Sequence, residues 1–359
     1  MGDFSVFDHM AQHQYEQVIH FYDRTTGLKG ITVIHNTTLG PALGGTRLWN
    51  YASEEEALID CLRLARGMTY KSAAAGLNLG GGKTVLIGDA QQVKSEAYFR
   101  ALGRYVQSLN GRYITAEDVN TSTKDMSYVA METSHVVGLE GKSGNPSPIT
   151  ALGVFYGIKA ALHKKYGTDE VEGRTFAVQG AGQTGYYLIG NLLEAGAKEI
   201  VFTEINPRHI ERMAQEHPQV RYVEPGAIYG QQVDVFSPCA LGGSLNGDTI
   251  PQIKAPIIAG SANNVLLDED VHGKMIMDRG IIYCPDFVIN AGGIINVYHE
   301  IMGYNRERAI ADAKKIYDRM LEILHIAEEQ NIPSQEAARL FAKKRIQTIN
   351  SLHDNYIPR

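Results

Sequence analysis

Residues 176–185 read Phe-Ala-Val-Gln-Gly-Ala-Gly-Gln-Thr-Gly, an apolar run followed at once by a GxGxxG motif. A helical pattern and a second apolar run, 200–203, come next. This order is that of a Rossmann unit, in which the first glycine makes a tight turn, the second lets the backbone approach a pyrophosphate and the third allows close helix–strand packing. Glu204 stands where an acidic residue binds the hydroxyls of the adenosine ribose. A carboxylate there disfavours the 2′-phosphate of NADP and so favours NAD. The expected NAD-binding residues here are Gly180, Ala181, Gly182, Gln183, Thr184, Gly185 and Glu204.

Strand patterns recur around this motif, separated by helical or loop segments. They cover 175–179, 199–204, 220–223, 233–237, 256–259 and 281–284. Such alternation predicts a doubly wound parallel sheet. Two further loops, 260–264 and 290–293, follow strands of this sheet. Their asparagines either bind a ligand at the carboxyl ends of the strands or only form Asx turns.

The rest of the chain also alternates between strand and helix patterns. Strands are expected at 31–34, 84–87 and 113–115. A helix is expected from the capping box at Ser53 to Gly67. Further helices are expected over 99–109, 150–165, 305–330 and 333–350. Prolines and small polar residues at 143–149 mark a boundary.

We therefore expect an α/β chain of two domains. Residues 1–145 form an α/β domain for substrate binding, catalysis and oligomerisation, and residues 146–332 form the Rossmann domain that binds NAD. Residues 333–359 form a C-terminal helix that returns to the first domain. A length of 359 residues suits this division.

Composition excludes several classes of function. The net charge is −6, from 34 Lys+Arg and 40 Asp+Glu, so no basic field attracts nucleic acid or an anionic membrane. No apolar run reaches the roughly 18 residues of a membrane span, and the N-terminus lacks signal-peptide features. The three cysteines form no CxxC pair, and the histidines show no metal-ligand spacing. We expect a cytoplasmic protein with no metal, nucleic-acid or membrane partner.

Two lysines stand near glycines, Lys71 after Gly67 and Lys83 after the run 80–82, and such glycines let a substrate approach the backbone closely. Two ammonium groups that converge in a desolvated cleft lower each other's pKa, so one serves as a base while the other binds a carboxylate. Asp118 follows the strand at 113–115, where a catalytic carboxylate is expected. The simpler alternatives are surface lysines and an aspartate that caps a helix.

The run Gly-Gly-Gly-Lys-Thr at 80–84 also raises the possibility of a phosphate-binding P-loop. That motif needs a glycine six residues before the lysine, where Leu77 stands. A strand pattern also follows Lys83 where a helix is required. Both the spacing and the context therefore disfavour a nucleotide hydrolase.

Taken together, these motifs resemble the glutamate/leucine/phenylalanine/valine dehydrogenase family over essentially the whole chain. The resemblance is carried by residues 38–47, 66–71, 73–83, 110–118, 144–148, 180–185, 260–264 and 285–293. It implies reversible oxidative deamination of an L-amino acid with NAD and water to a 2-oxo acid, ammonia and NADH. It also implies a homo-oligomer, an octamer in the branched-chain members.

The resemblance implies a role for each matching residue. Lys71 binds the substrate carboxylate with Gly44 and Asn264, Lys83 as a free amine activates the attacking water, and Asp118 exchanges protons with the substrate nitrogen. The substrate pocket is lined by Leu43, Met68, Ala116, Ile294 and Val297, and further cofactor contacts come from Ala240, Asn263 and Asn290.

An aliphatic pocket with no lysine at Leu43 favours leucine, valine and isoleucine over glutamate. A methylene is worth only about 1–3 kcal/mol in such a site, so all three are expected to react. Gly82 and Asn120 resemble the aromatic members instead, which keeps a phenylalanine or tryptophan dehydrogenase as the alternative. A protein that only binds NAD or an amino acid is disfavoured because Lys71, Lys83 and Asp118 are all present.

Overall fold

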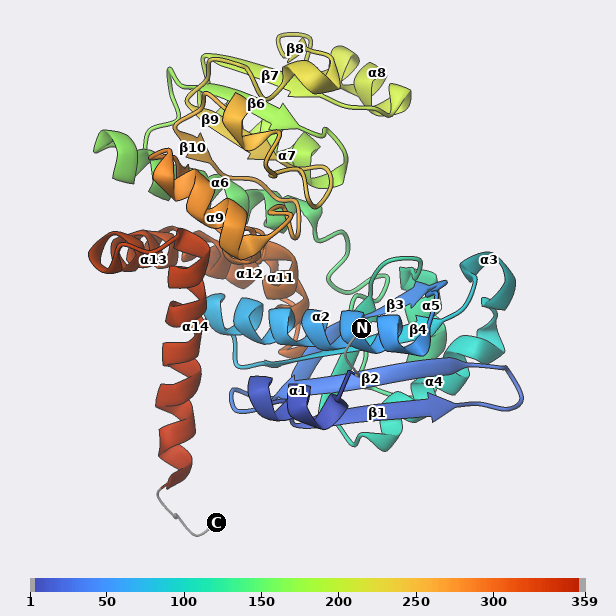
Figure 1. Ribbon diagram of the computed structural model, residues 1–359. Coiled ribbons are helices and arrows are strands. Elements are labelled where there is room, and N and C mark those ends of the chain that lie inside the picture. The colour runs from blue at the N-terminus through green and yellow to red at the C-terminus, as the bar shows by residue number, and fades with distance from the viewer. Residues whose placement is uncertain (1–3, 355–359) are drawn as a thin grey trace. The chain divides into compact units, whose positions relative to one another are not determined.

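The computed structural model describes residues 4–354, and these form two compact units (Figure 1). The first contains the chain up to Gly144, together with Val297–Tyr304 and the residues from Ala342 onward. The second contains Asn145–Asn296 and Asn305–Phe341. The chain thus passes between the units more often than one boundary and one returning helix imply. Two helices, α11 (Gly292–Ile301) and α14 (Ser334–Asn350), contribute residues to both units.

The first unit is built on a five-stranded mixed sheet. Its elements in chain order are α1 (Val6–His13), β1 (Gln17–Tyr22), β2 (Lys29–Asn36), β3 (Ala42–Trp49), α2 (Glu54–Ala74), β4 (Gly80–Ile87), α3 (Ala90–Val93), α4 (Glu96–Ser108), β5 (Tyr113–Glu117) and α5 (Thr123–Ala130). The strand order is β1-β2-β4-β3-β5. Strands β3, β4 and β5 run parallel, while β1–β2 and β2–β4 are antiparallel. Helix α2 covers one face, and α4 covers the other.

Helix α2 is longer than its sequence predicts. Its start is as expected, because the Ser53 hydroxyl accepts a hydrogen bond from the Glu56 N–H at 3.1 Å. Its expected end at Gly67 is wrong, since the helix continues to Ala74. A glycine inside a helix costs only about 1 kcal/mol, and burial of Thr69, Ser72, Ala73 and Ala74 in the extra turns outweighs it. The extension places Lys71 on the last turn of α2.

A buried histidine links β2 to α2. His35 is only 5% exposed; its Nε2–H donates to the His13 carbonyl at 3.1 Å, and its Nδ1 lies 2.8 Å from the Thr69 hydroxyl. Because a carbonyl only accepts, Nε2 must carry a hydrogen, while the Thr69 hydroxyl can donate to Nδ1 or accept from it. Burial lowers the pKa of His35 from 6.5 to about 4.

This histidine predicts a loss of stability in mild acid. Between pH 6.5 and about 4 the unfolded chain binds the proton and the folded chain does not, so the free energy of unfolding falls as the pH drops through that window. The shift sets an upper limit of about 3 kcal/mol. Urea unfolding should show this loss in the wild type and a smaller one in His35→Gln, in which His9 and His13 still titrate. Parallel losses in both proteins would contradict the assignment.

The second unit confirms the doubly wound parallel sheet. Its strands are β6 (Thr175–Gln179), β7 (Glu199–Thr203), β8 (Arg221–Tyr222), β9 (Val235–Pro238), β10 (Ile257–Ile258) and β11 (Ile282–Tyr283), in the order β11-β10-β9-β6-β7-β8. Every pair is parallel. The order reverses at β6, the strand before the glycine motif, and such a switch point is where these sheets bind ligands.

The helices of this unit accompany the sheet. They are α6 (Ser147–Tyr166), α7 (Gln183–Glu194), α8 (Pro207–Glu216), α9 (Glu269–Asp278), α10 (Asp286–Ile289), α12 (Arg306–Lys314) and α13 (Ile316–Gln330). The single long helix expected over 305–330 is wrong. It is broken at Lys315, whose N–H bonds to the Asp312 carbonyl three residues back, so the α-helical pattern stops there. Across residues 4–354, no helix combines the length and apolar character that crossing a membrane requires.

Candidate active site

Lys83 lies on a strand whose glycines bring the backbone of its neighbours very close. The sequence suggests a strand only from residue 84, but β4 already begins at Gly80. A Cβ at Gly80 would lie 1.9 Å from the Asn36 carbonyl oxygen, and one at Gly81 would lie 2.1 Å from the Thr69 nitrogen. These glycines therefore allow dense packing rather than leaving room for a substrate, and they fix the backbone that carries Lys83.

Lys83 and Asp118 form an ion pair. The Nζ of Lys83 lies 3.0 Å from Asp118 Oδ2, and the two side chains are 5% and 26% exposed. Asp118 follows β5 directly, as expected, and does not cap the next helix, because Ser122 does so. Burial lowers the pKa of Lys83, and Arg47 lowers it further, against the opposing effect of Asp118. Burial favours the protonated form of Asp118, but Lys83 and Arg47 together hold its pKa below the usual range.

Arg47 is a member of this cluster that sequence reasoning missed. Its Nε donates to Asp118 Oδ2 at 2.9 Å, and its NH1 donates to Asp60 Oδ2 at 2.9 Å. In the sequence, Arg47 is marked only by its place after the run Gly44-Gly45-Thr46, and that place does not indicate a role for it. Its contact with Asp118 depends on β3 lying beside β5, which the sequence does not reveal.

The other residues expected at the substrate site in this unit lie on the same elements. Leu43 and Gly44 are on β3, in register with Ile114 and Thr115 of β5, and Ala116 pairs with Gly45. Leu43 is buried, and the Gly44 carbonyl accepts a hydrogen bond from the Tyr113 hydroxyl at 2.7 Å. Met68 and Lys71 lie on α2, which packs on β4.

Two residues expected in the same pocket lie on α11. Ile294 is buried and belongs to the second unit, while Val297 is half-buried and belongs to the first. Their place in a common pocket stays a prediction.

The glycine motif has the geometry that a dinucleotide needs. Gly180 has φ +95°, and a Cβ there would lie 2.9 Å from the Ala240 side chain. Gly185 packs so closely that a Cβ would lie 2.0 Å from the Gly180 carbonyl oxygen. Gly182 is different, because the nearest atom to a Cβ there, on His209, is 3.9 Å away. The space above the second glycine is therefore open where a pyrophosphate approaches the start of α7.

The acid after β7 and the loops beyond β10 complete this edge of the sheet. Glu204 accepts hydrogen bonds from the N–H groups of Ala181 and Asn206, both at 3.0 Å. Asn290 is buried and donates to Asn263 Oδ1 at 2.8 Å, while its own Oδ1 has no hydrogen-bond partner within the described part of the chain. An unsatisfied buried carbonyl suits a donor such as the carboxamide of a nicotinamide. Asn264 adopts φ +49°, and Asn290 follows the short helix α10 rather than a loop.

Nothing between residues 4 and 354 groups three or more His, Cys, Asp or Glu side chains as a metal site would. The first unit therefore offers a desolvated amine beside a carboxylate, and the second unit offers a dinucleotide cradle.

Comparisons with known proteins found relatives over most of the chain. Residues 15–135 match the model described as Glu/Leu/Phe/Val dehydrogenase, dimerisation domain, and residues 198–353 match the model described as Glutamate/Leucine/Phenylalanine/Valine dehydrogenase. The chain is 54% identical to a leucine dehydrogenase of Geobacillus stearothermophilus, over 98% of this chain and 96% of that one. It is 47% identical to an L-tryptophan dehydrogenase of Nostoc punctiforme, over 95% and 96%.

A solved structure confirms the fold. The crystal structure of L-tryptophan dehydrogenase from Nostoc punctiforme superposes with a TM-score of 0.88 at 44% identity, and the match covers 96% of this chain and all of that one.

Proposed function

We propose that this chain, which belongs to the Glu/Leu/Phe/Val dehydrogenase family, is an NAD-dependent leucine dehydrogenase. The reaction converts an L-amino acid, NAD⁺ and water into a 2-oxo acid, ammonium, NADH and a proton. The observation that carries the proposal is the buried Lys83–Asp118 pair at 3.0 Å. It supplies an amine with a lowered pKa beside an ionised carboxylate, the two kinds of group that general acid–base catalysis uses.

The cradle would hold NAD, which would supply an acceptor for the hydride of the substrate α-carbon. The open space above Gly182 fits the pyrophosphate, and the unsatisfied Oδ1 of Asn290 fits the nicotinamide carboxamide. Glu204 stands at the end of β7, in the position suited to the ribose hydroxyls. This carboxylate repels a 2′-phosphate, which supports NAD rather than NADP. Asn263, which holds Asn290, and Ala240, which packs on Gly180, shape the same cradle.

The residues of the first unit carry the chemistry. Lys71 binds the substrate carboxylate, with Gly44. Lys83, as the neutral amine, takes a proton from the water that attacks the imino carbon of the substrate, and Asp118 exchanges protons with the departing nitrogen. Both groups are largely removed from water, which strengthens each electrostatic interaction in the site.

Leucine is the proposed substrate because the side chains assigned to the pocket are aliphatic, and because identity is higher to the leucine enzyme than to the tryptophan enzyme. The two departures from the leucine pattern have structural reasons. Asn120 has φ +59°, in the left-handed region that glycine adopts routinely and asparagine occasionally. A Cβ at Gly82 would lie 2.8 Å from the Tyr113 ring, so this glycine reflects packing.

The proposal predicts which amino acids reduce NAD. Absorbance of NADH, followed with each of the twenty L-amino acids and NAD at alkaline pH, should rise with leucine, valine and isoleucine. Their kcat/KM values should agree within about 200-fold, because one methylene is worth about 1–3 kcal/mol. NADP should react more slowly. A preference for phenylalanine or tryptophan would identify an aromatic dehydrogenase, and no reduction with any amino acid would reject the proposed function.

The match of residues 15–135 to a dimerisation domain supports a homo-oligomer. We propose that the protein is an octamer and that it works in the cytoplasm. Light scattering of the purified protein tests the number of subunits.

A further inference from the structure

The catalytic carboxylate is held by one of its two oxygens. Lys83 Nζ and Arg47 Nε lie 3.0 and 2.9 Å from the same atom, Asp118 Oδ2. The hydrogen bond from Arg47 ends on Oδ2, and Oδ2 is also the oxygen of this carboxylate that lies nearer to the Lys83 amine. Asp118 is therefore anchored through Oδ2.

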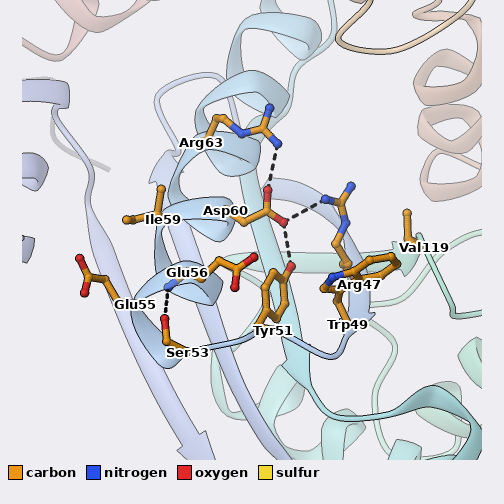
Figure 2. A pocket seen from close by; sticks show the side chains of 10 residues that line it. All are labelled: Arg47, Trp49, Tyr51, Ser53, Glu55, Glu56, Ile59, Asp60, Arg63 and Val119. Carbon is orange, nitrogen blue, oxygen red and sulfur yellow. Dashed lines mark hydrogen bonds and ion pairs between the residues drawn. The ribbon is translucent and has the colours of Figure 1, made fainter. Parts of the chain in front are cut away.

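Arg47 is itself fixed at its far end. Its NH1 lies 2.9 Å from Asp60 Oδ2, and the Tyr51 hydroxyl donates to the same oxygen at 2.7 Å. Arg63 donates to the other oxygen of Asp60 at 2.9 Å. Figure 2 shows Asp60 at the centre of these three contacts, with Arg47 turned toward it from β3. Arg47 thus bridges a carboxylate on α2 and the carboxylate that follows β5.

This bridge depends on the shape of the guanidinium. Two nitrogens on one rigid plane hold two carboxylates at once, whereas a lysine at this position offers a single nitrogen on a flexible stem. The side chains of Arg47 and Asp60 are 21% and 17% exposed, so solvent screens the bridge only in part. Both residues line a surface pocket of about 780 Å³ (Figure 2).

The charged and titratable groups around the pair come from four elements. Lys83 lies on β4, Arg47 on β3, Cys61 and Asp60 on α2, and Tyr113 on β5. Burial raises the pKa of Cys61 to about 12 and that of Tyr113 still higher, so both are neutral at working pH. Arg47 acts on both members of the pair, because it lowers the pKa of Lys83 and that of Asp118.

We infer that Arg47 is the positioning residue of the Lys83–Asp118 pair: it anchors Asp118 by Oδ2, leaves Oδ1 to exchange protons with the substrate nitrogen, and takes its own position from Asp60. This inference rests on the proposed function, because it assigns a partner to the group that handles the substrate nitrogen. The charge of Arg47 has a separate effect on Lys83. Removal of the positive charge raises the pKa of Lys83, since repulsion from Arg47 lowers it in the wild type.

The test compares Arg47→Gln, Arg47→Lys and Asp60→Asn with Arg63→Gln as the matched control. Arg63 binds the same Asp60 but does not touch Asp118. Arg47→Gln should lower kcat for leucine by roughly tenfold to a hundredfold, because a small misplacement of a reacting group has that effect. It should also move the acid limb of the kcat/KM profile up by roughly one pH unit, as loss of a charge within a few ångströms does.

The remaining variants separate charge from geometry. Arg47→Lys keeps the charge without the bridge, so the pH limb should stay near that of the wild type while kcat remains several-fold low. Asp60→Asn should lower kcat by less than Arg47→Gln does, and Arg63→Gln should leave both quantities within twofold of wild type. The titration of the substrate amine is common to every profile and cancels in the comparison.

A merely structural role for Arg47 would lower the melting temperature without moving the pH limb. The inference is overturned if Arg47→Gln, assayed well below its melting temperature, keeps the wild-type limb and a kcat within twofold of wild type. It is also overturned if Arg63→Gln has the same effects as Arg47→Gln. Should Arg47→Gln fail to fold, Arg47→Lys and Asp60→Asn decide the same question. Failure of the proposed function is distinct, because the wild type would then oxidise no amino acid.

Discussion

Replacement of Lys83 by alanine should lower kcat for leucine by about 10²–10⁴-fold, the range that a positioned general base supplies. The side chain is 5% exposed and lies 3.0 Å from Asp118, so its truncation removes the amine and leaves a cavity that lowers stability. Asp118 keeps Arg47 as a partner at 2.9 Å and is not left as an isolated charge. The variant should therefore fold and bind NADH with a Kd within about twofold of the wild type.

The pH profile gives this prediction a second measurement. Burial and Arg47 lower the pKa of Lys83 from its ordinary value of 10.5. Because the base acts as the free amine, wild-type activity should rise with pH through a limb that lies below that ordinary value. In Lys83→Ala the limb should vanish together with the rate.

Lys94→Ala is the matched control for this experiment. Lys94 also forms an ion pair with a buried aspartate, Asp125, at 2.5 Å, but it lies outside the site. That variant should keep the wild-type kcat and pH limb even where it lowers the melting temperature. Turnover by Lys83→Ala within tenfold of the wild type would remove Lys83 from the role of base.

The sequence predicts the second unit better than the first. All six parallel strands are signalled by short apolar runs, and the glycine motif specifies its own turn, because each of its glycines has a local reason to be there. The break at Lys315 has no such signal, since neither proline nor glycine occurs there. In the first unit the strand order β1-β2-β4-β3-β5 places residues far apart in sequence side by side, and no local pattern encodes that order.

The candidate site follows the same division. Lys83 and Asp118 are found because glycines and a strand end mark them, and the resemblance to a family gives them roles. Arg47 and Asp60 are missed because their importance lies in contacts across 71 and 13 residues of sequence. The glycines before Lys83 are seen but misread: they suggest room for a substrate, and the structure shows close packing instead.

The structural role of a glycine therefore depends on what surrounds it. Two glycine-to-alanine substitutions should show this, because they should change the free energy of unfolding in opposite directions. A Cβ at Gly44 would lie 1.7 Å from the Gly82 carbonyl oxygen and 3.1 Å from the Lys83 nitrogen, with backbone on both sides. Neither β3 nor β4 can give way without breaking the ladder that joins them. Gly44→Ala should destabilise the fold by more than about 3 kcal/mol, beyond the usual range of overpacking, and displace Lys83.

Gly67→Ala is the matched substitution. Gly67 is exposed inside α2, and a Cβ there would meet nothing within 4 Å. Alanine reduces the entropy of the unfolded chain, so the free energy of unfolding should rise by about 0.5–1 kcal/mol, with kcat unchanged. Urea unfolding of the two variants beside the wild type measures both effects. A Gly44→Ala protein as stable as the wild type would show that β3 and β4 separate easily, and the rigid support assigned to Lys83 would then be wrong.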